Sequence, residues 1–95
     1  MKGEKFMEEI TQEQINDIVQ NTPLLPVYSS NIQGIGYNEQ GKNLRVLFKG
    51  GGSYIYFNVE PEIYEQIKTS QSKGKTLNES VVKHKDKYKY IRINK

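Results

Sequence analysis

The stretch between Leu44 and Val59 constrains the fold of this chain more than any other part. Two runs dense in β-branched and aromatic residues flank three consecutive glycines, Gly50 to Gly52. Because glycine adopts backbone conformations that are closed to other residues, the glycine run can reverse the chain between two strands. The sequence therefore predicts a β-hairpin, around which the remaining segments are expected to pack.

Each strand of this hairpin carries an apolar row on one face, because side chains alternate between the faces of a strand. The two rows are Leu44, Val46 and Phe48, then Ile55, Phe57 and Val59. If both rows face the core, Tyr54 and Tyr56 lie on the opposite face. Arg45 and Lys49 of the first strand share that face with them. The pattern thus predicts a surface of aromatic rings and cations.

Two further strands are expected. Residues 32–37 form a short strand ahead of the hairpin, which makes an antiparallel meander of three strands. Gly34 and Gly36 within it predict a bulge or the close approach of another backbone. Residues 88–93 form the last strand. On one face it carries Ile91 and Ile93, and on the other Tyr88, Tyr90 and Arg92.

An N-terminal helix is expected over residues 12–21. Thr11 and Gln14 show the pattern of a capping box, in which each side chain bonds an unpaired backbone donor of the first turn. Pro23 and Pro26 end this helix, since proline disfavours a helical conformation in the residue before it. The helix is expected to cover an edge or a face of the sheet. The alternative is self-association or contact with a protein partner through this helix.

Two more helices follow the hairpin. Pro61 favours a first helical turn, and apolar residues recur at helical spacing up to about Ser70. Residues 72–75 then form a basic turn. Thr76 with Glu79 is the pattern of a second capping box, which opens a short helix.

These elements predict an α+β fold. It consists of a small antiparallel sheet, made of the three-stranded meander plus a C-terminal strand, with two helices between them and an added N-terminal helix. Residues 1–27 are interpreted as a leader (1–9) and helix, and residues 28–95 as the domain proper. Ninety-five residues suffice for one modest core.

The composition narrows the classes of function. The chain has no cysteine, no apolar secretion signal and no run long enough to span a membrane, so we expect a cytoplasmic protein. Its one histidine, His84, lies in a lysine-rich stretch without a nucleophile or metal-ligand pattern around it. We therefore expect neither catalysis nor a metal or other cofactor. Residues 71–95 carry eight basic and two acidic side chains, which indicates an anionic partner.

Several short motifs occur in an order that resembles the KTSC domain family. They are residues 29–32, 36–38 and 44–51, the central Tyr54-Ile55-Tyr56, Val59 with Pro61, residues 72–75, and Tyr88-Lys89-Tyr90. That family is named after the C-terminal end of certain lysyl-tRNA synthetases. The resemblance covers roughly residues 29 to 93 and implies a small domain that is often free-standing in bacteria and their phages. RNA binding is suggested by the synthetase context, and no catalytic residues carry over.

The residues favour a non-catalytic module that binds RNA or a phosphorylated nucleotide. Aromatic rings on a sheet face stack with bases, and neighbouring cations hold phosphates. The residues predicted to stack are Tyr54, Tyr56, Tyr88 and Tyr90, and those predicted to hold phosphates are Arg45, Lys73, Lys75 and Arg92. The opposing interpretation is that the tyrosines pack beneath a helix with only their hydroxyls in water.

A second class of function stays open. A small free-standing domain with an extra helix suits a phage or prophage anti-defence type protein. Such a protein sequesters a nucleotide signal, or blocks a host protein through protein-protein contacts. Polynucleotide binding would weaken steeply with salt, because counterions are released, whereas a mononucleotide pocket or a protein interface would respond far less.

Overall fold

The computed structural model describes residues 10–93, so the predicted leader at residues 1–9 lies outside the described residues. The strands are β1 (Leu25–Pro26), β2 (Ile32–Asn38), β3 (Asn43–Phe48), β4 (Ser53–Tyr56) and β5 (Tyr90–Ile93). The helices are α2 (Gln12–Gln20), α3 (Pro61–Thr69) and α4 (Lys73–Leu77), which continues as the π-helical turn η2 (Asn78–Val82). Within residues 10–93, no helix has both the length and the apolar character that crossing a bilayer requires.

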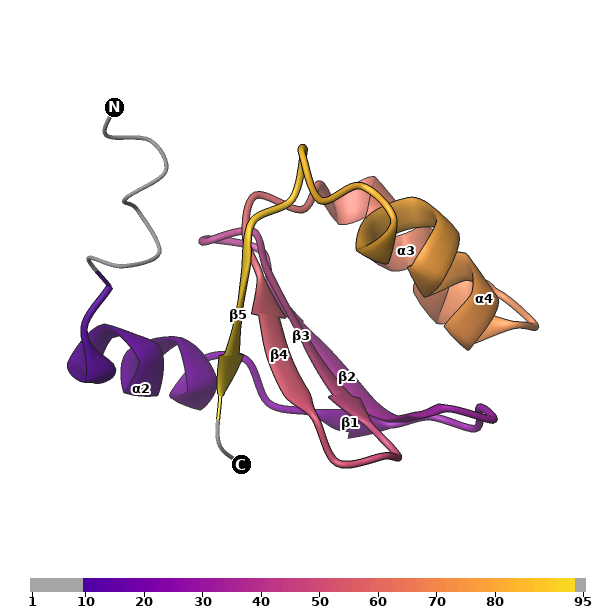
Figure 1. The fold of residues 1–95 in the computed structure, drawn as a ribbon, viewed down its shortest axis with the longest axis horizontal. Coiled ribbons are helices and arrows are strands. Elements are labelled where there is room, and N and C mark those ends of the chain that lie inside the picture. Colours follow the sequence, from indigo (N-terminus) through magenta and orange to yellow (C-terminus); the bar gives the residue numbers. More distant parts are fainter. Residues whose placement is uncertain (1–9, 94–95) are drawn as a thin grey trace.

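The strands form one antiparallel sheet in the order β1-β2-β3-β4-β5. The helices α3 and α4 lie on one face of this sheet and α2 lies on the other (Figure 1). The predicted α+β fold is confirmed, with the meander, the C-terminal strand beside it, two helices between them and an added N-terminal helix. The two-residue edge strand β1 was not predicted, because Leu25 and Pro26 carry no alternating pattern.

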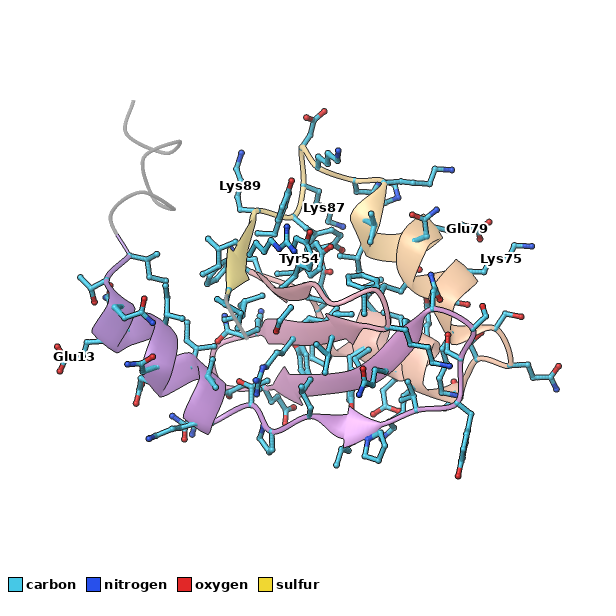
Figure 2. All side chains as sticks on the ribbon, turned by 60° about the horizontal axis from the view of Figure 1, so that its bottom comes forward. Glu13, Tyr54, Lys75, Glu79, Lys87 and Lys89 are labelled. Atoms are coloured by element: carbon cyan, nitrogen blue, oxygen red, sulfur yellow. The ribbon has the colours of Figure 1, made fainter. Side chains whose placement is uncertain are left out.

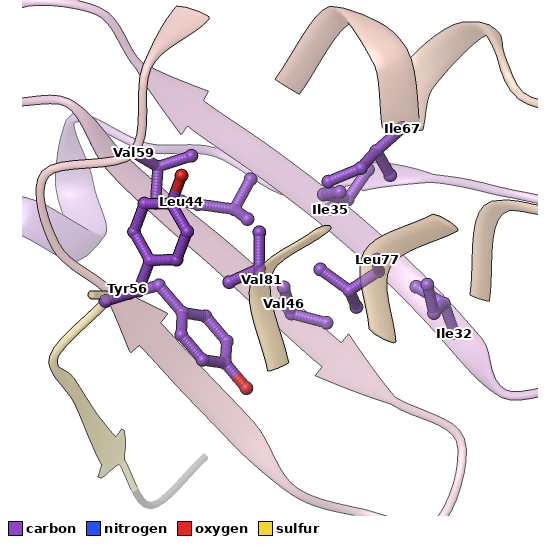
Figure 3. Close-up of a cluster of buried hydrophobic side chains, with 10 residues drawn as sticks. Ile32, Ile35, Leu44, Val46, Tyr56, Val59, Ile67, Leu77 and Val81 are labelled. Carbon is purple, nitrogen blue, oxygen red and sulfur yellow. The ribbon is translucent and has the colours of Figure 1, made fainter. Parts of the chain in front are cut away.

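The core lies between the sheet and the α3/α4 layer (Figure 3). Leu44 and Val46 of β3 are fully buried there against Ile67 of α3, Leu77 of α4 and Val81 of η2. A fully buried side chain of this size stabilises the fold by about 1.5–3 kcal/mol. This apolar contact therefore holds the helices on the sheet.

The register of the β3/β4 hairpin differs from the predicted one. Leu44 pairs with Tyr56 and Val46 with Tyr54, so both tyrosines point toward the helices. The predicted position of these tyrosines on the opposite face beside Arg45 is wrong. Ile55 pairs with Arg45 instead and is fully buried. The predicted register, in which the two apolar rows share a face, differs from this pairing by one residue.

The turn explains this register. The amide of Phe48 donates to the carbonyl of Gly52 at 2.8 Å, which closes a three-residue loop, Lys49 to Gly51. Gly51 has a φ of 107°, a conformation that side-chain-bearing residues rarely adopt. Loop length and turn geometry fix the pairing in a hairpin. Turn geometry therefore outweighs the match between the two apolar rows.

Val59 reaches the core by a different route. β4 ends at Tyr56, and the chain turns at Asn58, whose φ is 59°. Val59 is consequently fully buried beside Leu44, on the same side of the sheet as Tyr56 (Figure 3).

The helix α2 covers part of the second sheet face, as predicted. The capping box is present: the amide of Gln14 donates to Oγ1 of Thr11 at 3.0 Å, and the amide of Thr11 donates to Oε1 of Gln14 at 2.8 Å. Nη1 of Arg45 donates to the carbonyls of Thr22 at 3.1 Å and Val19 at 3.5 Å, near the end of α2. These bonds fasten the helix to β3. A role of α2 in self-association or partner contact stays a prediction.

The second predicted capping box is wrong. The helix α4 begins at Lys73, so Thr76 lies inside it and its Oγ1 lies 2.7 Å from Oγ of Ser70. The basic motif at residues 72–75 is therefore largely helical. The irregularity predicted from the β2 glycines is confirmed, since the pairing with β3 shifts between Ile32 and Gly34.

A tyrosine pocket as the candidate functional site

A pocket of about 380 Å³ opens where β4 and β5 meet η2 and the segment that follows it. Its walls carry the rings of Tyr54, Tyr56 and Tyr90, together with Phe48. Lys85 and Arg92 line the same pocket. We call this feature the tyrosine pocket.

Strand pairing gathers these side chains. Tyr54 of β4 pairs with Arg92 of β5, and Tyr56 pairs with Tyr90, so all four point to one face of the sheet. The predicted alternation of β5, with Tyr90 and Arg92 on one face and Ile91 on the other, is thereby confirmed. The hairpin turn brings the β4 tyrosines to the same face.

The three tyrosine rings form one cluster. The ring centroids lie 6.3 Å apart for Tyr54 and Tyr56, 5.9 Å for Tyr54 and Tyr90, and 5.6 Å for Tyr56 and Tyr90. Phe48 meets Tyr54 edge to face at 5.6 Å, and the guanidinium carbon of Arg92 lies 5.8 Å from the centroid of the Tyr54 ring. Aromatic pairs of this kind contribute about 0.5–1.5 kcal/mol beyond their burial.

The rings differ in their access to solvent. Tyr90 is 41% exposed and Tyr54 is half-buried, whereas Tyr56 is only 5% exposed at the inner wall. A flat ligand therefore meets Tyr90 and Tyr54 first. The sequence left two interpretations open, in which the tyrosines lie on an exposed sheet face or pack beneath a helix. The structure is intermediate between them, because the helix layer buries Tyr56 and leaves Tyr90 exposed.

Tyr88 lines the tyrosine pocket, but its hydroxyl is bonded to a side chain outside the pocket. It is 1% exposed, and its hydroxyl donates to Oε1 of Glu60 at 2.7 Å. This bond lowers the pKa of the Glu60 carboxyl. Lys87 pairs with the other oxygen of Glu60 at 3.4 Å and lies over the Tyr88 ring. Tyr88 thus anchors the segment before β5 to the start of α3.

Three of the predicted phosphate-binding residues lie away from the tyrosine pocket. Arg45 is on the other face, bonded to the end of α2. Nζ of Lys73 donates to the carbonyl of Ser70 at 2.9 Å, and neither Lys73 nor Lys75 lines the pocket. In Figure 2, Lys75 extends from the helices apart from Tyr54. The ligand roles of these three residues stay predictions that this geometry does not support.

Lys85 was missed as a site residue. The sequence marked it only as one of several lysines in the basic C-terminal part. It reaches the tyrosine pocket because the turn after η2 folds back, with the amides of Lys87 and Tyr88 donating to the carbonyl of His84 at 3.0 and 2.9 Å. Such a turn leaves no periodic pattern in the sequence, so the position of Lys85 could not be predicted.

A larger cavity, of about 880 Å³, lies between α2 and the loop ends of the sheet. Its lining includes Glu13 and Asp17 and no lysine or arginine among the described residues. This charge disfavours an anionic ligand there, so the tyrosine pocket is the better candidate for the predicted partner.

Comparison with known proteins identifies the family. The model of the KTSC domain matches residues 28–88 of this chain. The chain belongs to the KTSC domain family. The match leaves α2, β1 and β5 outside the family region.

A solved structure agrees with this assignment, and two curated proteins are similar to parts of the chain. The crystal structure of a KTSC domain protein from Yersinia pestis superimposes with a TM-score of 0.69 at 29% identity, covering 77% of this chain and 99% of that one. A protein from Tsukamurella paurometabola is 36% identical over 53 residues, which are 56% of this chain and 79% of that protein. A lysine-tRNA ligase from Nostoc punctiforme is 31% identical over 72 residues, which are 76% of this chain and 12% of the ligase.

The position of Tyr54 in this KTSC domain requires glycine at residue 52. A Cβ on Gly52 would lie 2.8 Å from Cε1 of Tyr54, whereas a Cβ on Gly50 meets nothing within 4 Å. We expect Gly52→Ala to displace the Tyr54 ring and Gly50→Ala to leave it in place. Chemical shifts of the Tyr54 ring, measured by NMR in both variants, check this. Equal shifts in the two variants would show that the turn does not set the ring's position.

The buried Tyr56 makes this KTSC domain sensitive to alkaline pH. Burial raises the pKa of Tyr56 from 10.0 to about 12, with smaller contributions from Tyr54 and Tyr90. Between these two values the unfolded chain releases the proton and the folded chain keeps it, so stability is full below pH 10 and falls as pH rises toward 12. The slope is at most about 1.4 kcal/mol per pH unit for this group.

Urea unfolding measured between pH 9 and 12 checks this expectation, with Tyr56→Phe as the matched variant. That substitution should make the slope shallower without abolishing it, because burial also raises the pKa of Tyr37 and Tyr88. Identical slopes in the two proteins would contradict the assignment to Tyr56.

Proposed function

We propose that this KTSC domain is a non-catalytic module that binds a nucleotide unit, in RNA or as a free phosphorylated nucleotide, in the tyrosine pocket. The base stacks on Tyr90 and Tyr54, while Arg92 and Lys85 contact the phosphate. One observation supports this most: three clustered tyrosine rings and two cations line a single pocket, and neither cation pairs with a carboxylate within residues 10–93.

The dimensions and energies suit such a ligand. The pocket volume of about 380 Å³ lies in the range of roughly 300–1,000 Å³ that is usual for small-molecule sites. Stacking of a base on an aromatic side chain is worth about 1–3 kcal/mol. Two stacking rings with two charge contacts of about 1 kcal/mol each can therefore give about 4–8 kcal/mol at low salt, which corresponds to dissociation constants between millimolar and micromolar.

The lining of the tyrosine pocket favours binding over catalysis. Among the described residues that form it there is no carboxylate and no histidine, the groups that most often act as general acid or base. The similarity to a stretch of a lysine-tRNA ligase supports RNA as the partner, because the name of that protein states that it acts on tRNA. Since RNA and free nucleotides are abundant in the cytoplasm, we propose that the domain acts there.

Calorimetric titration of the purified domain tests the proposal. The ligands are a nucleoside, its monophosphate and a short single-stranded RNA, each at low and moderate salt. We expect heat of binding for the phosphorylated ligands, and RNA affinity that falls with salt because counterions are released. Binding of the free nucleotide alone would favour the nucleotide-sequestering alternative. No heat with any of these ligands would overturn the proposal.

A further inference from the structure

A second hollow adjoins the tyrosine pocket. Five consecutive residues, Lys83 to Lys87, form it, and its volume is about 220 Å³. Lys85 lines both this hollow and the tyrosine pocket, so the two sites share that side chain. We propose that this lysine hollow is a phosphate subsite that accepts a phosphate adjacent to the stacked nucleotide. The inference rests on the proposed function and extends it to a second part of the ligand.

The charges of the lysine hollow support a phosphate. Three of its five residues are lysines and one, Asp86, is acidic. Lys87 is partly neutralised by Glu60 at 3.4 Å, whereas Lys83 and Lys85 pair with no carboxylate in the described part of the chain. Two unpaired ammonium groups on an exposed turn attract an anion that brings more than one charge.

The hollow is also held in shape. Its turn is closed by the amides of Lys87 and Tyr88, both of which donate to the carbonyl of His84. Nε2 of His84 lies 2.9 Å from the carbonyl of Glu79, which fixes the ring against η2. The bond from Tyr88 to Glu60 anchors the far end of the turn. A preorganised turn loses less entropy when it binds, so the lysines can contribute measurable affinity.

Two ligands share the chemistry that this subsite requires. In single-stranded RNA, the phosphate that occupies the subsite is the next one along the strand. In a free nucleotide, it is the second or third phosphate of the nucleotide. Both predict that a monophosphate binds less tightly than a ligand with a further phosphate. The two sources are separated by comparing ATP with an RNA dinucleotide that carries a terminal phosphate.

Lys83→Gln tests the subsite, because Lys83 lines only the lysine hollow. Lys42→Gln is the matched control, since Lys42 is an exposed lysine that lines neither site. We expect Lys83→Gln to weaken binding of the ligand with the additional phosphate by about tenfold, which corresponds to 1.4 kcal/mol. Adenosine and AMP should bind the Lys83→Gln variant as they bind the unchanged domain, and Lys42→Gln should change nothing.

For an RNA ligand the salt dependence gives a second readout. The slope of log affinity against log salt should become shallower by about 0.7 in Lys83→Gln, because one phosphate contact to a single strand is lost. An effect with the dinucleotide and not with ATP assigns the subsite to RNA, and the reverse assigns it to a free nucleotide. Unchanged affinity for both would overturn the subsite while leaving base binding in the tyrosine pocket intact. Failure of adenosine, AMP and RNA alike to bind would overturn the proposed function itself.

Discussion

Replacing Gly36 by alanine should destabilise the domain by about 3 kcal/mol, the upper end of the usual cost of overpacking. A Cβ at this position would lie 2.3 Å from the carbonyl oxygen of Pro23 and 3.2 Å from that of Thr22. Both are backbone atoms, and Thr22 is fully buried, so the neighbours cannot move aside cheaply. Urea denaturation followed by far-UV circular dichroism measures the loss.

Gly34→Ala is the matched control on the same strand. A Cβ there would lie 3.4 Å from Cβ of Leu24, which is an ordinary contact distance. We expect Gly34→Ala to be neutral or to stabilise the domain by up to about 1 kcal/mol, because glycine in a strand interior is destabilising relative to alanine. If Gly36→Ala and Gly34→Ala unfold at the same urea concentration, the backbone of Thr22 and Pro23 does not pack closely against Gly36.

Tyr90→Ala should lower the affinity for a nucleotide or short RNA by roughly 10- to 100-fold, the equivalent of one lost base stack. Tyr90 is the most exposed ring of the tyrosine pocket, at 41%, so its truncation removes a contact surface with little damage to the core. Its ring also supports Tyr54 and Tyr56 at 5.9 and 5.6 Å. Calorimetry at a temperature well below the melting point of each variant measures the effect.

Two variants isolate the stacking contribution. Tyr90→Phe keeps the ring and should retain most of the affinity, whereas Tyr28→Ala removes a fully exposed tyrosine that does not line the tyrosine pocket and should change nothing. Equal losses in Tyr90→Ala and Tyr28→Ala would indicate non-specific binding to surface aromatics. Full affinity in Tyr90→Ala would remove this ring from the site.

The sequence predicts the elements of this fold better than the pairing between them. The capping box at Thr11, the helix after Pro61 and the alternation of β5 are local patterns, and the structure contains each one. The β3/β4 register is not local. It depends on a three-residue turn that includes Gly51 in a left-handed conformation, and three adjacent glycines do not reveal which of them takes it.

The same distinction holds for the candidate site. Tyr54, Tyr56, Tyr90 and Arg92 were predicted to share a face, and the structure brings them together. They do so for a different reason than expected, since they point toward the helix layer and away from Arg45. Lys85 could not be predicted, because it depends on how the turn after η2 packs. A basic stretch predicts charge, and only the fold shows which lysine meets an aromatic ring.

The central claim is that a nucleobase lies against the rings of the tyrosine pocket, and intermolecular nuclear Overhauser effects test it most directly. The measurement uses the isotopically labelled domain with an unlabelled short RNA. The account predicts contacts from base protons to the ring protons of Tyr90 and Tyr54, together with shifts at Arg92 and Lys85. Bound RNA that shows contacts only elsewhere, such as to Lys73 and Lys75 on α4, would contradict it.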